Sequence, residues 1–182
     1  MSGFVLWFTG LSGAGKTTIA NNVEPELERR GFVLDHLDGD IVRTHLSKGL
    51  GFSKEDRDTN IARIGWVASR LARAGAVVIV SAISPYEEMR RHARSLVEQH
   101  APFVEIHVAT SLEVCAERDP KGLYKKALAG EIEHFTGVSD PYEEPSNPAL
   151  RLHTEGREPA ESAAAVLARL GELQLIPDEV TA

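Results

Sequence analysis

The sequence has almost no cysteine: Cys115 is the only one among its 182 residues. A single thiol excludes an intramolecular disulfide and any zinc site built from several cysteines. The seven histidines are dispersed without the spacing of metal ligands, so we expect no zinc held by the protein. Apolar neighbours at Leu112, Val114 and Ala116 predict that Cys115 is a buried, structural residue of a helix.

Positive charge is also scarce. The chain carries 20 Lys and Arg against 27 Asp and Glu, for a net charge of −7. General nucleic-acid binders and membrane-surface binders need an excess of Lys and Arg, so the sequence predicts neither kind of partner. A small anionic substrate is still allowed, because it needs only a local cluster of positive charge.

Long hydrophobic runs are absent as well. The apolar start of the chain, residues 1–8, is too short to span a bilayer, and no basic segment precedes it. It leads directly into a glycine-rich loop, which favours a buried first strand. We therefore expect no membrane partner and a cytoplasmic protein.

Short apolar runs alternate with amphipathic patterns along the chain. Strands are expected at residues 4–9, 77–81 and 103–109, with weaker candidates at 32–37 and 150–153. Helices are expected at residues 16–30, 55–74, 87–99, 112–118 and 159–173. This alternation predicts an α/β fold of three layers, a doubly wound parallel sheet with helices on both faces. No internal repeat or low-complexity linker is present, so residues 1–182 are expected to form a single domain.

Two segments do not follow this regular alternation. Pro25 lies inside the first helical pattern, where its missing N–H predicts a kink or a break near Glu24. Residues 119–147 carry many Gly, Pro, Lys and Glu residues with little periodicity. A segment of that length in a compact domain is typical of a functional loop or lid.

A phosphate-binding loop follows the first expected strand. Eight consecutive residues match the G-x-x-x-x-G-K-[ST] pattern in full: Gly10, Leu11, Ser12, Gly13, Ala14, Gly15, Lys16 and Thr17. Its backbone N–H groups and the following helix N-terminus suit the phosphates of ATP. Lys16 suits the β- and γ-phosphates, and the Thr17 hydroxyl suits Mg²⁺. The alternative, a glycine-rich turn without a ligand, does not account for the full match in a strand–loop–helix context.

The loop indicates the P-loop NTPase and kinase type of fold without specifying the reaction. The sequence has no Asn-Lys-x-Asp motif for reading guanine, and neither His-Arg-Asp nor Asp-Phe-Gly of protein kinases. A kinase of a nucleoside or another small metabolite therefore remains.

Asp38 and Asp40 follow the second expected strand and flank Gly39. Two carboxylates at a strand end suit coordination of a hydrated metal or removal of a proton from an acceptor hydroxyl. An ordinary Asp-Gly-Asp turn is the plain alternative, and the phosphate loop upstream favours the functional interpretation.

Polar residues also begin the next helix, where Ser53 and Asp56 resemble a capping box. The apolar stripe of that helix, extended backwards, reaches Arg57 and Asn60, so its first turn is expected to border a cavity. With Arg43, Arg57 forms a plausible clamp for an anion; two solvated arginines are the alternative. After the strand at 77–81, Ser84 either donates to a substrate oxygen or accepts phosphate, or it only begins a helix with the proline that follows.

Together these segments resemble the adenylyl-sulfate kinases. The matching runs are residues 8–17, 37–40, 50–53, 83–86, 129–132, 135–137 and 140–143. The most distinctive run is Arg118-Asp119-Pro120-Lys121-Gly122-Leu123-Tyr124-Lys125-Lys126-Ala127. The resemblance covers nearly everything from Val5 to about Leu152. It implies ATP-dependent phosphorylation of the 3′-hydroxyl of adenylyl sulfate by direct in-line transfer with Mg²⁺, and it also implies a homodimer.

The resemblance further implies a role for each matching residue. Phe52 and Phe135 would stack on the substrate adenine, and Arg43, Arg57 and Asn60 would hold its phosphosulfate and ribose side. Asp38 and Asp40 would face the 3′-hydroxyl and Mg²⁺, with Asp40 and Thr17 as the metal contacts. Lys16, Asp38, Asp40 and Ser84 are thus the expected catalytic residues, Ser84 matching a position described as a phosphoserine. Ile83, Lys121 and Leu123 complete the expected substrate site, and Arg118 would lie near the ATP adenine.

Some positions depart from the family pattern. Ile41 stands where asparagine is usual, Trp66 stands where glutamate is frequent, and residues 44–48 differ from the common form. Ile41 and Trp66 leave open a non-catalytic nucleotide-binding homologue, and a kinase of another small metabolite or nucleoside is a second alternative.

Overall fold

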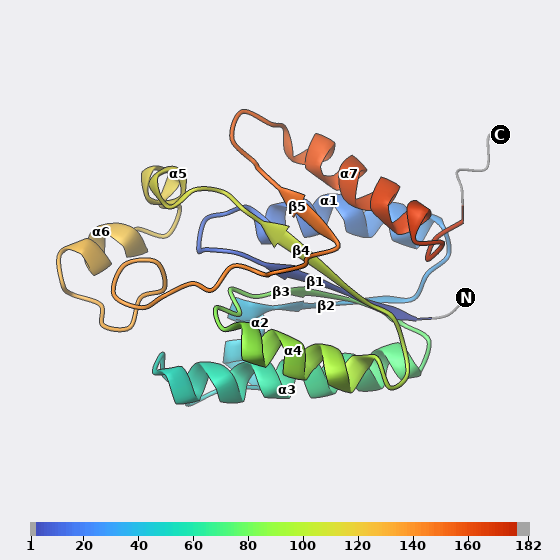
Figure 1. Cartoon of the computed structure of the whole chain (residues 1–182), viewed down its shortest axis with the longest axis horizontal. Coiled ribbons are helices and arrows are strands. Elements are labelled where there is room, and N and C mark those ends of the chain that lie inside the picture. The colour runs from blue at the N-terminus through green and yellow to red at the C-terminus, as the bar shows by residue number, and fades with distance from the viewer. Residues whose placement is uncertain (1–2, 178–182) are drawn as a thin grey trace.

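The structure is a computed structural model that describes residues 3–177. Its centre is a five-stranded sheet in the order β2-β3-β1-β4-β5, with every neighbouring pair parallel (Figure 1). The strands are β1 (Phe4–Thr9), β2 (Leu34–Asp38), β3 (Val77–Ser81), β4 (Phe103–Val108) and β5 (Leu150–Leu152). The predicted parallel α/β sheet is confirmed, with β2 beginning two residues later than expected.

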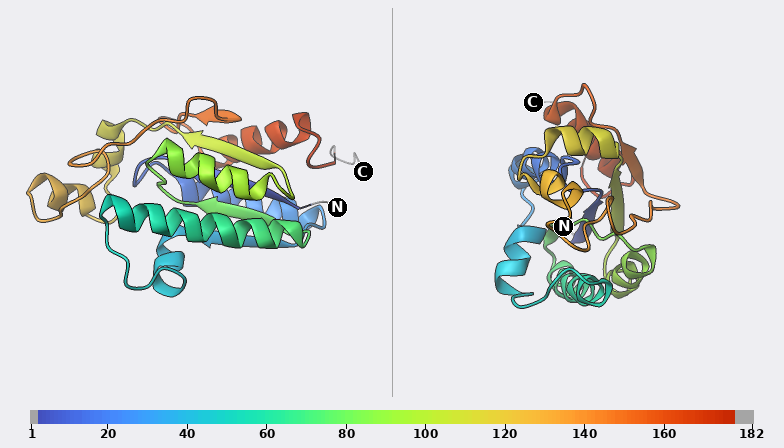
Figure 2. Two further views of the ribbon diagram at one scale, coloured as in Figure 1. Left: turned by 60° about the horizontal axis from the view of Figure 1, so that its bottom comes forward. Right: turned by 90° about the vertical axis from the view of Figure 1, so that its left-hand side faces the viewer.

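Helices cover both faces of this sheet. They are α1 (Lys16–Arg29), α2 (Gly39–His45), α3 (Lys54–Arg73), α4 (Glu87–Val97), α5 (Leu112–Arg118), α6 (Leu123–Leu128) and α7 (Pro159–Glu172). Helices α1 and α7 lie on one face and α3 and α4 on the other, which gives the three predicted layers (Figures 1 and 2).

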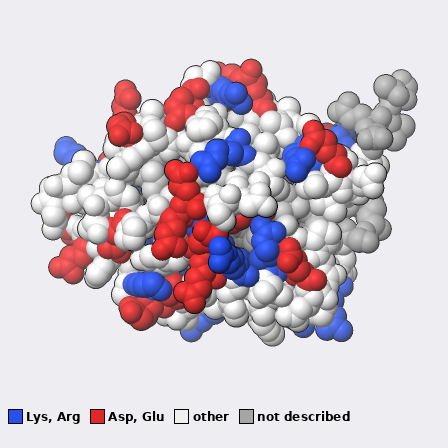
Figure 3. Space-filling view, in the orientation of Figure 1, with Lys and Arg blue, Asp and Glu red and all other residues white. Residues whose placement is uncertain are grey.

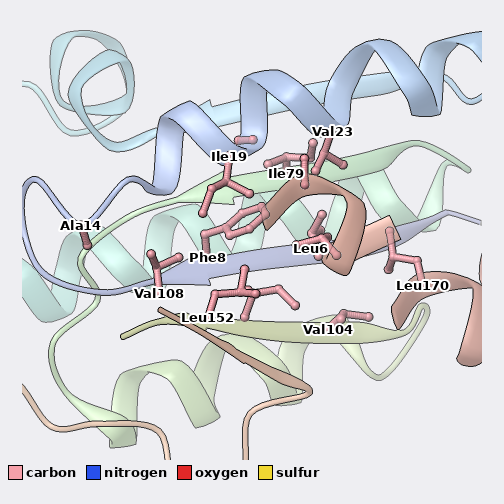
Figure 4. Close-up of a cluster of buried hydrophobic side chains, with 14 of the residues drawn as sticks. Leu6, Phe8, Ala14, Ile19, Val23, Ile79, Val104, Val108, Leu152 and Leu170 are labelled. Atoms are coloured by element: carbon pink, nitrogen blue, oxygen red, sulfur yellow. The ribbon is translucent and has the colours of Figure 1, made fainter. Parts of the chain in front are cut away.

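Strand β1 is buried on both faces because it lies in the middle of the sheet. Leu6 and Phe8 point toward α1, where they pack with Ile19 and Val23 (Figure 4). Trp7, which alternates with them, joins the cluster under α3 and α4. This alternation explains why a continuous apolar run encodes the strand. Cys115 of α5 is fully buried, as predicted.

Two sequence predictions about the helices fail. The sequence predicts a kink or a break near Glu24; α1 runs as one helix through Pro25, so the break is wrong. Pro25 and Asn21 are both exposed, and the Asn21 carbonyl that proline leaves without its helical donor therefore faces solvent. Helices α2 and α6 were not predicted. In contrast, α3 begins where predicted, with the Ser53 hydroxyl accepting a hydrogen bond from the backbone N–H of Asp56. Only this half of the expected capping box forms, because the Asp56 carboxylate accepts from the backbone N–H of Gly51.

The surface carries charges of both signs. Acidic and basic side chains intermingle over the face shown in Figure 3, without a continuous basic area. No helix within residues 3–177 is both long enough and apolar enough to cross a bilayer.

The carboxyl ends of β2, β3 and β1 lie next to one another in the sheet. Ligands of open α/β sheets bind outside this edge. Helix α6 and the loops around it, within residues 119–147, extend beyond the same edge, at the left of Figure 1. The fold thus brings the phosphate loop, the Asp38–Asp40 turn and the expected lid to one end of the molecule.

Candidate active site

A cavity of about 600 Å³ opens at this edge of the sheet. That volume is in the range of small-molecule sites, roughly 300–1,000 Å³. Its walls come from the phosphate loop, the turn after β2, the start of α3, the turn after β3 and the segment after α5. Most of the residues predicted from the sequence line it: Ser12, Gly13, Gly15, Lys16, Thr17, Asp38, Asp40, Arg43, Phe52, Arg57, Asn60, Ile83, Ser84, Lys121, Leu123 and Phe135.

The phosphate loop bends at glycines that no other residue would replace easily. Gly10 has φ of +151°, and a Cβ there would lie 2.5 Å from the carbonyl oxygen of Val108. The loop then wraps around the Lys16 side chain, whose Nζ donates to the carbonyl oxygens of Gly10 (2.9 Å) and Leu11 (2.8 Å). The loop and its lysine therefore form one closed unit before α1 begins.

Burial lowers the pKa of Lys16 to about 8, because the charged ammonium loses much of its water. Nearby carboxylates of Asp38 and Asp40 oppose this effect only in part. An arriving polyphosphate would restore the lost stabilisation of the charge. The lysine is thus set to respond to an anion rather than to neutralise a protein carboxylate.

Asp38 joins the phosphate loop to the turn after β2. Its Oδ2 accepts a hydrogen bond from Thr17 Oγ1 (2.7 Å), and its Oδ1 accepts one from the backbone N–H of Asp40 (2.9 Å). Burial opposes ionisation, but these hydrogen bonds outweigh it and lower the pKa of Asp38. Asp38 is also the N-cap of α2. Asp40 points to the opposite wall, where its Oδ2 pairs with Nζ of Lys121.

These oxygens fit a magnesium ion. The Thr17 hydroxyl and the Asp38 carboxylate lie 2.7 Å apart, close enough for both oxygens to contact one small cation. Among the described residues, no cluster of three His, Cys, Asp or Glu side chains is placed to hold a metal. Mg²⁺ needs only one or two carboxylates and takes its other ligands from water and phosphate.

Two arginines and an aromatic ring form the opposite end of the cavity. The guanidinium carbons of Arg43 and Arg57 lie 4.4 Å and 5.5 Å from the centre of the Phe52 ring. Arg57 also donates from Nε to the Phe52 carbonyl (2.9 Å) and from a terminal nitrogen to the His134 carbonyl (2.5 Å). Phe52 is half exposed, whereas Phe135 is buried. The arginines are held by the protein while charge and ring face the cavity together.

Two buried polar atoms in the cavity wall have no hydrogen-bond partner among the described residues. They are Oδ1 of Asn60 and Oγ1 of Thr136. Buried polar atoms in proteins are nearly always paired, so these two atoms lack a partner of the kind that the folded chain usually supplies. Asn60 was predicted from the sequence, but Thr136 was not, because it lies in a loop with no periodic pattern.

Ser84 has an unusual environment. It is buried, its φ of 42° lies in the left-handed region, and its hydroxyl accepts a hydrogen bond from Nε1 of Trp7 (3.1 Å). The hydroxyl proton points to the Ala82 carbonyl (3.3 Å). Ser84 therefore borders the cavity with a side chain that protein groups already hold.

Some expected residues lie outside the cavity lining. Gly10, Leu11 and Ala14 form the far side of the phosphate loop. The Arg118 guanidinium donates to the hydroxyl (2.8 Å) and to the carbonyl (3.1 Å) of Thr154. The Thr154 hydroxyl in turn lies 3.2 Å from the carbonyl oxygen of Ala14 in the phosphate loop. Thr154 was not predicted, because its approach to the loop joins residues 140 positions apart.

The parallel sheet, the phosphate loop with its buried lysine, and the carboxylate beside Thr17 define a P-loop phosphotransferase. The model of the family described as "Adenylylsulphate kinase" matches residues 2–153. The chain therefore belongs to the adenylylsulphate kinase family.

Individual relatives agree with this assignment. An adenylyl-sulfate kinase of Rippkaea orientalis is 56% identical over 171 residues, covering 94% of this chain and 93% of that protein. The structure of the Mycobacterium tuberculosis APS kinase CysC in complex with AMPPNP and APS matches with a TM-score of 0.90 and 46% identity, covering 93% of this chain and 98% of that one. A Sorangium cellulosum relative, named as a bifunctional SAT/APS kinase, is 55% identical over 97% of this chain, which spans 30% of that longer protein.

Proposed function

We propose that this chain transfers the γ-phosphoryl group of ATP to the 3′-hydroxyl of adenylyl sulfate, giving 3′-phosphoadenylyl sulfate and ADP. Its membership of the adenylylsulphate kinase family supports the proposal. The observation that carries it is one continuous cavity that joins the phosphate loop to the wall of Phe52, Arg43 and Arg57. Such a cavity has a place for a triphosphate at one end and for an anionic adenine nucleotide at the other.

Transfer at this site needs positioning and neutralisation of charge more than a strong base. When ATP binds, the Lys16 ammonium would exchange its hydrogen bonds to the Gly10 and Leu11 carbonyls for bonds to phosphate oxygens. There it would stabilise the charge on the transferring phosphoryl group. Asp38, ionised and held by two hydrogen bonds, orients the acceptor hydroxyl. In-line transfer requires no covalent enzyme intermediate, so Ser84 need not accept the phosphoryl group. Its role would be to maintain the shape of the turn after β3.

Thr17, with Asp38 or Asp40, would hold Mg²⁺, and the ion would neutralise charge on the β- and γ-phosphates. Thr17→Val keeps the shape of the side chain and removes its oxygen. We expect the variant to need a much higher magnesium concentration for half-maximal turnover, and an unchanged requirement would refute this role.

The acceptor would bind between the aromatic and basic residues of the far wall. Phe52 and Phe135 offer ring faces for the adenine, and Arg43 and Arg57 offer donors for the phosphosulfate. The unpaired Oδ1 of Asn60 is available to a ribose hydroxyl. Arg118 would lie near the adenine of ATP, behind the loop.

The segment at residues 119–147 would act as the lid within a single domain, with Lys121 and Leu123 closing over the substrates. Lys121 would exchange its partner, Asp40, for substrate phosphate. The working form would be a homodimer in the cytoplasm. Analytical ultracentrifugation tests the homodimer, which an active monomeric enzyme would refute. Cell fractionation tests the cytoplasmic location.

A coupled assay of ADP release tests the function directly. Wild-type protein with Mg·ATP should release ADP only when adenylyl sulfate is present, and Lys16→Ala should abolish the release while circular dichroism stays unchanged. A flat signal would refute the proposal. Release with another acceptor from a panel of nucleosides and metabolites would favour a different kinase, and calorimetric binding of both nucleotides without turnover would favour a non-catalytic homologue.

A further inference from the structure

Arg90 of α4 is almost completely buried, yet it does not touch the cavity. Its exposed fraction is 2%, among the lowest of any large side chain in the described residues. A buried guanidinium is costly unless its donors are satisfied, and replacing a buried ion pair by apolar residues is often neutral or favourable for stability. Stability alone is therefore a weak reason for this residue, and its contacts indicate another one.

Each nitrogen of the Arg90 guanidinium has a different partner. Nε donates to the Glu105 carboxylate of β4 (3.1 Å), one terminal nitrogen donates to the Ser84 carbonyl (2.7 Å), and the other donates to the Glu143 carbonyl (2.7 Å). Ser84 belongs to the turn that lines the cavity after β3. Glu143 belongs to the segment that returns from the expected lid. The planar fork of arginine thus joins the cavity turn to the end of the lid segment.

Further bonds fasten the same two segments together. The backbone N–H of Glu143 donates to the Pro85 carbonyl (2.8 Å), and the Glu143 carboxylate accepts from the backbone N–H of Glu87 at the start of α4 (2.7 Å). The Thr9 hydroxyl donates to the Ile83 carbonyl (2.7 Å). Tyr142 reaches the Thr9 hydroxyl from the other side (2.9 Å). Because the single proton of Thr9 is used by Ile83, Tyr142 is the donor of that bond.

The turn needs such support. Ser84 has a φ of 42°, a conformation that residues other than glycine keep only when their surroundings hold them. Its carbonyl is one of the groups that Arg90 binds, and its hydroxyl is bonded to the buried Trp7. Loss of the arginine would free the turn to relax and would release the lid segment at Glu143.

We infer that Arg90, oriented by Glu105, is a positioning residue for the acceptor half of the site. It holds the turn at residues 83–85 and the end of the lid segment in the arrangement that receives the acceptor nucleotide. This inference rests on the proposed function for its kinetic test only. The phosphate loop makes none of these contacts, so ATP binding should not depend on Arg90.

The kinetic test compares Arg90→Lys with Arg94→Met. Lysine keeps the charge beside Glu105, but its single nitrogen cannot serve three partners in three directions. Arg94 lies one turn later on α4 and also binds Glu105 (3.3 Å), but no bond joins it to Ser84 or Glu143, so it is a matched control. We expect Arg90→Lys to raise the KM for adenylyl sulfate about tenfold, as loss of a charged hydrogen bond does, with less than a twofold change for ATP. The Arg94→Met variant should change neither constant beyond twofold.

A second readout needs no turnover. In a Trp66→Phe background, Trp7 is the only tryptophan, and its side chain is fully buried against Ser84. Arg90→Lys should increase the quenching of Trp7 fluorescence by acrylamide, whereas Arg94→Met should not. If the wild type does not turn over adenylyl sulfate, the proposed function fails, and quenching alone still tests the anchoring role of Arg90.

Tyr142→Phe covers the case in which Arg90 variants do not fold, as judged by circular dichroism. It removes one hydroxyl from the same connection and leaves the buried charge in place. Threefold or greater loss of acceptor affinity with unchanged ATP affinity would support the inference. Well-folded variants with unchanged acceptor KM and unchanged quenching would overturn it, and so would equal effects in Arg94→Met.

Discussion

The buried lysine of the phosphate loop should make ATP binding sensitive to pH. Burial lowers the pKa of Lys16 to about 8, against an ordinary value of 10.5. The free protein therefore loses this charge between pH 7.5 and 9.5, a range in which an exposed lysine keeps it. Bound triphosphate favours the charged form and raises the pKa again. Affinity for Mg·ATP should fall as the pH rises through 8.

The size of this fall follows from the charged fraction of Lys16. With a pKa of about 8, that fraction decreases from roughly three quarters at pH 7.5 to roughly 3% at pH 9.5. If only the charged form binds tightly, the apparent Kd rises about 25-fold, which corresponds to about 2 kcal/mol. Near pH 8.5, binding should take up about 0.8 proton per site, because about a quarter of the free protein is charged there.

Isothermal titration calorimetry measures both quantities. Mg·ATP is titrated into the protein without an acceptor, at several pH values and in buffers of different ionisation enthalpy. Lys16→Met is the control, since it keeps a long side chain in the buried position and removes only the titrating group. The pH dependence of ATP itself is common to both proteins and cancels in the comparison. Equal pH profiles and equal proton uptake in the two proteins would refute the argument.

Three further substitutions test other parts of the site and the fold. Phe52→Ala should raise the KM for adenylyl sulfate at least tenfold and leave that for ATP unchanged, because the ring faces the acceptor end; an unchanged acceptor KM in steady-state assays would contradict this. Ser84→Ala should keep turnover within about tenfold of the wild type, since the hydroxyl is held by Trp7 and direct transfer needs no phosphoserine. A loss of a thousandfold or more in kcat would favour the covalent route. Gly65→Val should lower the free energy of unfolding, measured in urea, by about 1–3 kcal/mol. Even a Cβ at this position would lie 2.9 Å from the Cβ of Ala93 and push α3 away from α4. Equal unfolding midpoints would show that the helices adjust freely.

The sequence predicts the central parts of the fold because their signals are local. β1 and β3 are nearly continuous apolar runs, since they are buried on both faces, and β4 keeps a strongly apolar pattern around Glu105 and His107. Helix α3 has a stripe whose polar continuation at Arg57 and Asn60 indicates where it leaves the core, and both residues line the cavity. Each of these features is contained in about twenty consecutive residues.

The missed elements are short or depend on distant contacts. α2 and α6 have 7 and 6 residues, and they begin at Gly39 and directly after Gly122, where the sequence favours a turn. Pro25 does not break α1, because its position on an exposed face removes the main cost of the missing hydrogen bond. Arg90 fits the helical pattern of α4 without any sign of its role. Its three partners lie 6, 15 and 53 positions away in the sequence and meet only in the folded protein.

The ATP side of the site is easier to predict from the sequence than the acceptor side, and this difference has a physical cause. The ATP side is recognised largely through backbone N–H groups of one loop, so its requirements are written in eight consecutive residues from Gly10 to Thr17. The acceptor side is recognised through side chains, which come from α2, α3, the turn after β3 and the lid segment. Side-chain recognition leaves no spacing rule in the sequence, because each group needs only to reach the cavity. Within a family that shares the loop, we therefore expect the acceptor to be selected by residues such as Phe52 and Arg43, together with the contacts that hold their walls in place. Arg90 is the clearest of those contacts, and it lies outside the runs of residues that carry the resemblance in the sequence.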